Sequence, residues 1–266
     1  MKLLLLGNPP ALLGATIIRH TQAVGRAALF FVMGLRHLCA WPWQIEKIVE
    51  QLFFIGFKSL FIITLTGAFT GMVLGLQGYY TLVKFGSEGM LGAAVALSLI
   101  REMGPVLTAI MVVARAGSAM AAEIGIMRIS EQIDALETMD IQPVRFLFSP
   151  RLAAAILSYP LLTALFDVVG ILGGYLTGSV LLGIQSGIYF SRVESSVEMQ
   201  DVTGGFVKAL CFAVLATTIC CYQGFYTHYR TEAFGAKGVS LSTTSAVVIS
   251  CVVILIADYV LTSFLL

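Results

Sequence analysis

The chain has 266 residues, of which 58% are hydrophobic and only 12% are charged, and its formal net charge is +1. Soluble globular proteins carry about 25% charged residues, so this composition excludes that class and indicates a protein with several membrane spans. The balanced charge and the absence of a basic block argue against nucleic acid as a partner. The five cysteines lack metal-ligand spacing, so we interpret them as small apolar residues of helices and expect no metal or cofactor.

The N-terminal region is apolar but is interrupted too often by charge to span a bilayer, which requires about 20 apolar residues. Arg19 and Arg26 are seven residues apart and therefore share a helical face. This pattern predicts one or two amphipathic helices in the membrane interface, and a plain surface anchor is an equally good interpretation. We expect two regions, an interfacial segment over 1–50 and a membrane domain over 51–266.

Five later segments are apolar and long enough to cross a membrane. We expect these spans at 52–83, 89–114, 152–182, 202–226 and 246–266. The first and third carry glycines at four-residue spacing, which are Gly67, Gly71, Gly75 and Gly170, Gly174, Gly178. Small residues at this spacing let two helices approach closely, so both sets are interpreted as packing surfaces.

Two adjacent charges, Arg101 and Glu102, interrupt the second apolar segment. An ionisable group at bilayer depth costs about 3 kcal/mol on insertion scales, so it usually faces a partner, a cavity or a substrate path. Lys208 lies early in the fourth segment, which runs in the same direction as the second. Glu102 and Lys208 are therefore expected at similar depth. They form either a site for an amphipathic ligand or an ion pair that only joins two helices.

The connection between the second and third spans predicts an acidic amphipathic helix that can dock on a soluble partner. One face of this helix carries Ile129, Ile133 and Leu136, and the other carries Glu131, Asp134 and Glu137. Basic residues precede the first span and follow the second and fourth, whereas only Lys84 and Arg192 occupy the alternate loops. This asymmetry predicts that the N-terminus and the acidic helix are cytoplasmic and that the C-terminus is external.

The chain contains no GxxxxGK[ST] phosphate loop and no GxSxG or HExxH motif. It therefore binds no nucleotide by the phosphate-loop route. If the polar site belongs to a transport path, the energy for transport must come from elsewhere. The leading hypothesis is a membrane cavity that is coupled to a cytoplasmic motor through the acidic helix. Two other functions remain open. One is a lipid-modifying membrane enzyme that uses only carboxylates, and the other is an ion-coupled transporter driven through Glu102, Asp167 or Asp258.

Three stretches resemble the MlaE permeases of bacterial MCE-type ABC transporters. They are GAFTGMVLGLQGYYTL, ALSLIREMGPVLTAIMVVARAGSAMAAEIGIMRISEQIDALETM and SPRLAA. The resemblance extends from about Gln51 to the C-terminus. It implies an all-α membrane protein with N-terminal interfacial helices, five transmembrane helices, a cytoplasmic coupling helix between the second and third spans, and a homodimeric assembly in the bacterial inner membrane.

The resemblance also implies a non-catalytic subunit that moves phospholipids between the inner and outer membranes and so maintains outer-membrane lipid asymmetry. The implied partners are an MlaF-type ATPase, an MlaB-type STAS protein and an MlaD-type MCE hexamer. The coupling helix, over residues 128–139, would contact the ATPase through Arg128, Glu131, Gln132, Asp134, Leu136 and Glu137. The lipid cavity would be lined by Leu74, Leu82, Phe85, Arg101, Glu102 and Lys208.

Overall fold

The computed structural model describes residues 9–38, 44–227 and 235–265, and every secondary-structure element in these ranges is helical. Five helical segments are long and apolar enough to cross a membrane, which confirms the expected all-α fold with five candidate spans. They are Ile45–Val83, Glu88–Ile129, Pro143–Leu181, Met199–Phe225 and Ala236–Leu265. Five such helices indicate a multi-pass membrane protein.

Each span consists of one or more consecutive helical elements. The first joins α2 (Ile45–Ile55), η1 (Phe57–Ser59) and α3 (Leu60–Val83). The second joins η2 (Glu88–Met90), α4 (Leu91–Ser98), η3 (Leu99–Met103), α5 (Gly104–Val112), η4 (Val113–Gly117) and α6 (Ser118–Ile129). The third is α8 (Pro143–Tyr175) with η5 (Leu176–Leu181), the fourth is α10 (Met199–Phe225), and the fifth is α11 (Ala236–Leu265). Three helices lie outside the spans, namely α1 (Pro9–Leu38), α7 (Gln132–Thr138) and α9 (Ser186–Ser196).

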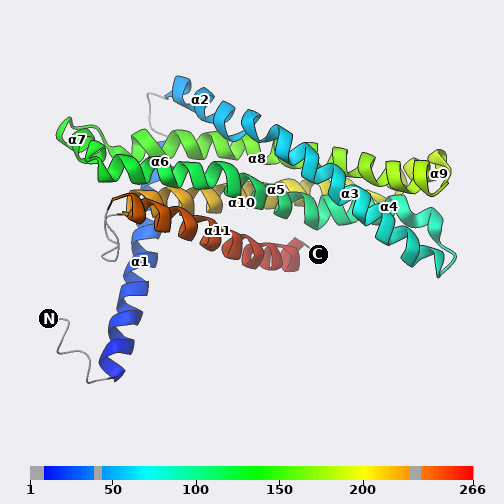
Figure 1. Ribbon diagram of the computed structural model, residues 1–266, viewed down its shortest axis with the longest axis horizontal. Helices are drawn as coiled ribbons and strands as arrows, with labels where there is room; N and C mark the ends of the chain where they lie inside the picture. Colours follow the sequence, from blue (N-terminus) through cyan, green and yellow to red (C-terminus); the bar gives the residue numbers. More distant parts are fainter. Residues whose placement is uncertain (1–8, 39–43, 228–234, 266) are drawn as a thin grey trace.

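The spans lie side by side along the long axis of the molecule (Figure 1). The short helix α7 marks one end of this bundle, and α9 marks the other. The C-terminal end of α11 points toward the α9 end. The two ends of the bundle therefore carry different helices, and each end can have its own function.

The α3 and α8 helices approach each other closely where they cross, as the glycine pattern predicts. A Cβ atom on Gly71 would overlap the backbone of Gly170, and a Cβ on Gly75 would lie 3.1 Å from the carbonyl oxygen of Gly174. A Cβ on Gly67 would lie 3.0 Å from the carbonyl oxygen of Phe166. Only hydrogen fits at Gly71, and a Cβ at Gly67 or Gly75 would be tight, so α8 packs directly on the α3 backbone.

Three of the helical elements inside the spans, η3, η4 and η5, are π-helical. Such turns are rare and often occur at functional sites. In η4, Arg115 turns toward the junction of α2 and α3, where its Nη1 donates to the carbonyl of Phe54 at 2.7 Å and to Ser59 Oγ at 2.8 Å. This guanidinium therefore joins the first and second spans.

The helix α1 leaves the bundle at a steep angle (Figure 1). Its second half docks through Phe30, whose ring centre lies 4.8 Å from that of Phe148 and 5.5 Å from that of Phe225. Val24 and Leu29 remain exposed on the same helix. Exposed apolar side chains are typical of a helix in contact with lipid. The interfacial location of residues 1–50 stays a prediction.

Candidate functional site

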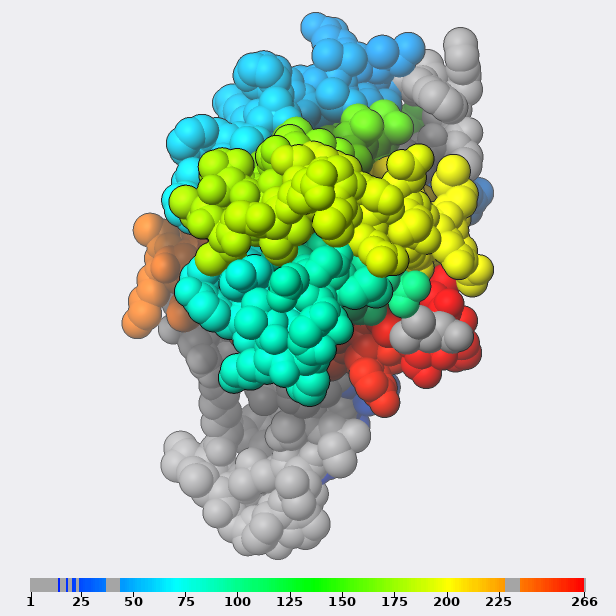
Figure 2. Space-filling view, turned by 90° about the vertical axis from the view of Figure 1, so that its right-hand side faces the viewer, coloured from blue at the N-terminus to red at the C-terminus, as the bar shows by residue number. Residues whose placement is uncertain are grey.

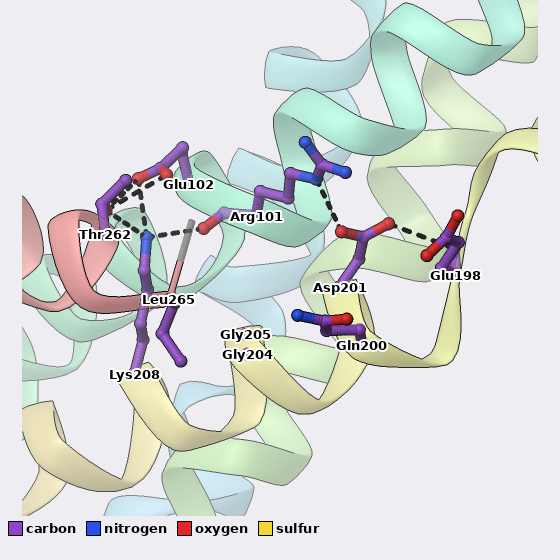
Figure 3. Close-up of a pocket in the computed structure, with 10 residues that line it drawn as sticks. All are labelled: Arg101, Glu102, Glu198, Gln200, Asp201, Gly204, Gly205, Lys208, Thr262 and Leu265. Carbon is purple, nitrogen blue, oxygen red and sulfur yellow. Dashed lines mark hydrogen bonds and ion pairs between the residues drawn. The ribbon is translucent and has the colours of Figure 1, made fainter.

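The ammonium group of Lys208 is the centre of a polar cluster near the α9 end of the bundle. Lys208 comes from α10 and is only 3% exposed. Its Nζ donates to Glu102 Oε2 at 2.8 Å and to Thr262 Oγ1 at 2.7 Å, and it lies 3.2 Å from Asp258 Oδ1. One amine thus joins the second, fourth and fifth spans (Figure 3).

A backbone carbonyl completes the surroundings of Lys208. Pro105 has no N–H, so it cannot donate to the carbonyl of Arg101 four residues earlier in the manner of a regular helix. Lys208 Nζ donates to this carbonyl oxygen at 2.8 Å. The proline therefore creates an acceptor inside the second span, and the lysine uses it.

Arg101 points away from Lys208 toward the start of α10 (Figure 3). Its Nε donates to Asp201 Oδ1 at 2.7 Å. The other carboxylate oxygen, Asp201 Oδ2, accepts from the backbone N–H of Glu198 at 3.1 Å and so belongs to the cap of α10. The helix start and the guanidinium thus hold each other in place.

These residues surround a pocket of about 190 Å³. Its lining comes from η3, the start of α10 and the end of α11, and the last two segments lie near each other in the view from the α9 end (Figure 2). The lining includes Gly204 and Gly205, and a Cβ on Gly205 would lie 2.6 Å from the carbonyl oxygen of Ile100. Glycine therefore lets α10 touch the backbone of η3 and brings Lys208 within reach of Glu102.

The pocket has room for a polar headgroup but is smaller than the pockets of about 300–1,000 Å³ that enclose whole ligands. Two cations, Arg101 and Lys208, face the carboxylates of Glu102, Glu198 and Asp201. A group that carries both charges can therefore find donors and acceptors here. An isolated anion would be repelled, because the carboxylates in the lining outnumber the cations.

The structure brings three of the six expected cavity residues, Arg101, Glu102 and Lys208, to this pocket. Leu74 and Leu82 are half-buried on α3 and pack against the core, and Phe85 is exposed after the end of that helix. None of these three lines the pocket.

Sequence reasoning placed Asp258 in the last span but did not connect it to Lys208. Asp258 and Thr262 are four residues apart, and the Thr262 hydroxyl lies 2.8 Å from the Asp258 carbonyl. This spacing puts both side chains on one face of α11, which is a signal that could have identified them as a pair.

The segment expected to be one amphipathic helix over 128–139 is interrupted. The helix α6 ends at Ile129, Glu131 has a φ of 58°, and α7 begins at Gln132. At the end of α6 the carbonyl of Ile126 accepts both the backbone N–H of Ser130, at 2.9 Å, and the Ser130 hydroxyl, at 2.8 Å. The prediction of a continuous helix was therefore wrong.

The break separates residues that the helical wheel placed on one face. Ile133 is fully buried, whereas Ile129 on α6 is exposed. Arg128 Nη1 and Asp134 Oδ1 lie 2.7 Å apart across the break. Glu131, Gln132 and Glu137 are exposed and Leu136 is half-buried. The result is a projecting turn at the end of the bundle (Figure 1), and the exposed side chains of Glu131, Asp134 and Glu137 make its surface acidic.

Comparison with known proteins gives consistent matches over nearly the whole chain. The family model described as "Permease MlaE" matches residues 48–264. The intermembrane phospholipid transport system permease protein MlaE of Haemophilus influenzae is 43% identical over 258 residues, with 95% of each chain covered. A probable ABC transporter permease protein of Rickettsia typhi is 41% identical and covers 97% of this chain and 98% of its own.

A chloroplast protein also matches, at lower coverage. Protein TRIGALACTOSYLDIACYLGLYCEROL 1 of Arabidopsis thaliana is 38% identical over 216 residues, which is 81% of this chain and 60% of the relative. The family match covers the second, third and fourth spans completely and nearly all of the first and fifth. The chain therefore belongs to the MlaE permease family of ABC transporters.

Proposed function

We propose that this chain is the membrane subunit that moves phospholipids between the inner and outer membranes of a bacterium, so that the outer membrane keeps its lipid asymmetry. The observation that carries the proposal is the pocket around Arg101, Glu102 and Lys208, which is polar and lies near one end of an apolar bundle. A phospholipid needs an apolar surface with a charged mouth. The name of the Haemophilus relative, which refers to intermembrane phospholipid transport, supports this substrate class.

A second copy of the chain would complete the cavity. The pocket in one chain holds only a headgroup-sized volume, and the fifth span is the least buried of the five. Exposed apolar residues such as Val252, Leu255 and Tyr259 run along α11, which also carries Thr262 of the pocket. A homodimer that pairs around this region would add an apolar wall for acyl chains. Leu74, Leu82 and Phe85 are further candidates for such a wall.

Removal of the Glu102 carboxylate is expected to weaken lipid binding at the pocket. In Glu102→Ala, labelling of the purified protein by a photoreactive phospholipid should fall by about tenfold, because one charge-assisted contact contributes about 1.5–3 kcal/mol. The same change at exposed Glu194 on α9 is the control and should leave labelling unchanged. Equal labelling in Glu102→Ala and the parent would assign Glu102 to a purely structural ion pair with Lys208.

Energy would come from an MlaF-type ATPase that binds the turn formed by the end of α6 and α7. A partner can shift the permease between two states only if it binds them with different affinity. The projecting turn is firmly attached to the second span, since Ile133 is buried and Arg128 pairs with Asp134. Movement of the ATPase would therefore be passed to the helix that carries Glu102. MlaB-type and MlaD-type proteins would complete the complex.

Charge reversal on the projecting turn is expected to abolish association with the ATPase. The suitable variant is Glu131→Lys with Glu137→Lys, because both side chains are exposed and neither has an ion-pair partner within the described chain. Recovery of the ATPase with the purified permease should fall below about a tenth of the parent value, since like charges across an interface cost several kcal/mol.

The matched control reverses the same number of charges at the other end of the bundle, in Glu88→Lys with Glu194→Lys. Both pairs of substitutions should leave the protein inserted in the membrane. Undiminished recovery of the ATPase by the Glu131 and Glu137 variant would show that the turn is not the contact. Lipid transfer that persists after ATP depletion would instead favour the ion-coupled transporter or the enzyme.

The proposed location is the bacterial inner membrane, with the N-terminus and α7 cytoplasmic and the C-terminus periplasmic. The distribution of basic residues supports this orientation. The pocket around Lys208 would then face the outer leaflet, and the acidic turn would meet the cytoplasmic ATPase.

A further inference from the structure

A second pocket lies where α2, α6 and α8 meet, toward the α7 end of the bundle and away from Lys208. Its volume is about 150 Å³. Three of its lining side chains carry buried polar atoms without a hydrogen-bond partner in the part of the chain that the structure describes. These atoms are Lys47 Nζ, Gln51 Oε1 and Arg151 Nε.

The protein holds the guanidinium of Arg151 through both Nη atoms, and its Nε has no hydrogen-bond partner among the described residues. Its Nη1 donates to the carbonyl of Leu147 at 2.7 Å, and its Nη2 lies 2.9 Å from Glu123 Oε2. The side chain is 5% exposed. Leaving a buried donor without a partner costs about 1–3 kcal/mol, so an unpartnered Nε on a side chain that lines a pocket points to a ligand.

Lys47 and Gln51 approach the same pocket from α2. They are four residues apart and therefore lie on one face of that helix. Lys47 Nζ lies over the ring of Phe146 and has no hydrogen-bond acceptor within residues 44–227. The pocket thus offers two cationic donors and one amide acceptor, none of which the surrounding helices satisfy.

The depth of the pocket points to a ligand reached from the membrane. The apolar run of the first span begins at Leu52, so Gln51 lies directly before it and Lys47 lies a little more than one helical turn outside it, at the level of lipid headgroups. Val49, Phe53 and Phe57 form an exposed apolar stripe on the same stretch of helix. This stripe lies on the face of the helix opposite Lys47 and Gln51, so the helix meets acyl chains on one side and the pocket on the other.

We propose that this second pocket binds the phosphate-bearing headgroup of a membrane phospholipid, with Lys47 Nζ and Arg151 Nε donating to the phosphate oxygens. Gln51 Oε1 accepts from an ammonium or hydroxyl group of the same headgroup, and the exposed carboxylate of Glu50 stands beside it. The site lies at the membrane face where the first span begins. The assignment of this membrane face to the cytoplasmic side rests on the proposed function, and the lipid site itself does not.

Localised photolabelling tests this site separately from the pocket around Lys208. The full-length protein in lipid nanodiscs is exposed to phosphatidylethanolamine that carries a photoreactive group near its headgroup, and labelled peptides are identified after pepsin digestion. In Lys47→Met, labelling of residues 44–51 and 143–151 should fall by about tenfold, the loss expected for one charge-assisted hydrogen bond. Labelling of residues 198–208 should stay at the parent level.

Two variants keep the result interpretable. Lys58→Met removes the same charge from an exposed lysine of the same span outside the pocket, and it should change neither signal. Gln51→Leu leaves both cations in place and should lower labelling of the second pocket to a smaller extent. Absence of labelling at residues 198–208 in the parent protein, with residues 44–51 labelled, would count against the proposed function and not against this site.

Three outcomes would overturn the proposal. Equal labelling of residues 44–51 in Lys47→Met and the parent would exclude Lys47 from headgroup binding. Equal labelling by a diacylglycerol probe that lacks phosphate would remove the role of the phosphate. Complete displacement of the lipid probe by inorganic phosphate would show a site for a free anion in place of a lipid headgroup.

Discussion

Replacement of Lys208 by methionine is expected to destabilise the protein more than any other single change in the polar cluster. Methionine fills a similar volume but leaves the carboxylates of Glu102 and Asp258 facing one another without a cation. Breaking a buried ion pair by removing one partner costs about 3–5 kcal/mol, and the partial exposure of Glu102 favours the lower value.

Thermal unfolding in detergent measures this effect. A loss of about 3 kcal/mol corresponds to a fall in the unfolding temperature of about 6–12 °C, on the scaling for soluble domains of 150–250 residues. The control variant combines Lys208→Met with Glu102→Gln and Asp258→Asn, which removes the unpaired charges and should recover most of the lost stability. An unfolding temperature for Lys208→Met equal to that of the parent would show that the three spans do not depend on this amine.

Substitution of Gly71 by alanine is the second change with a large expected effect. The added methyl group would overlap the Gly170 backbone and would lie 2.6 Å from its carbonyl carbon. Backbone atoms cannot rotate out of the way, so α3 and α8 must separate along the crossing. Overpacking typically costs about 1–3 kcal/mol, and a clash with backbone places this variant at about 3 kcal/mol.

Gly170 offers an internal control on the same crossing. A Cβ at Gly170 would meet mainly the end of the flexible Leu99 side chain, which can change its rotamer. Gly170→Ala should therefore unfold at a temperature closer to that of the parent, and Gly187→Ala, where nothing lies within 4 Å, should be neutral at the crossing. The account of the crossing fails if Gly71→Ala and Gly170→Ala unfold together at the parent temperature.

The positions of the spans could be predicted from the sequence because lipid contact requires long apolar runs. The ends of the spans could not be predicted in this way. The first and third spans were expected to begin at 52 and 152, whereas the helices begin at Ile45 and Pro143. A helix can continue past the bilayer with polar residues in its terminal turns, here the first turns of both spans. Hydropathy alone does not detect that extension.

The approach of Glu102 to Lys208 could be inferred from the direction of the spans, but the contribution of α11 could not. Nothing in the linear sequence fixes how α11 is rotated about its own axis, and that rotation brings Asp258 and Thr262 to the lysine. The broken helix before α7 was missed for a related reason. The helical-wheel pattern assumed continuous geometry, while Glu131 adopts a left-handed backbone conformation.

The π-helical turn η3 also affects how the second span can be altered by insertion or deletion. A π turn holds more residues than an α turn, and each residue added to a regular helix rotates everything beyond it by about 100°. Deleting one residue between Leu99 and Met103 would restore regular winding and keep the two halves of the span nearly in phase, but it would remove the wide turn that positions Arg101 and Glu102. Chain length in this turn is therefore part of the specification of the site, alongside the chemical identity of its side chains.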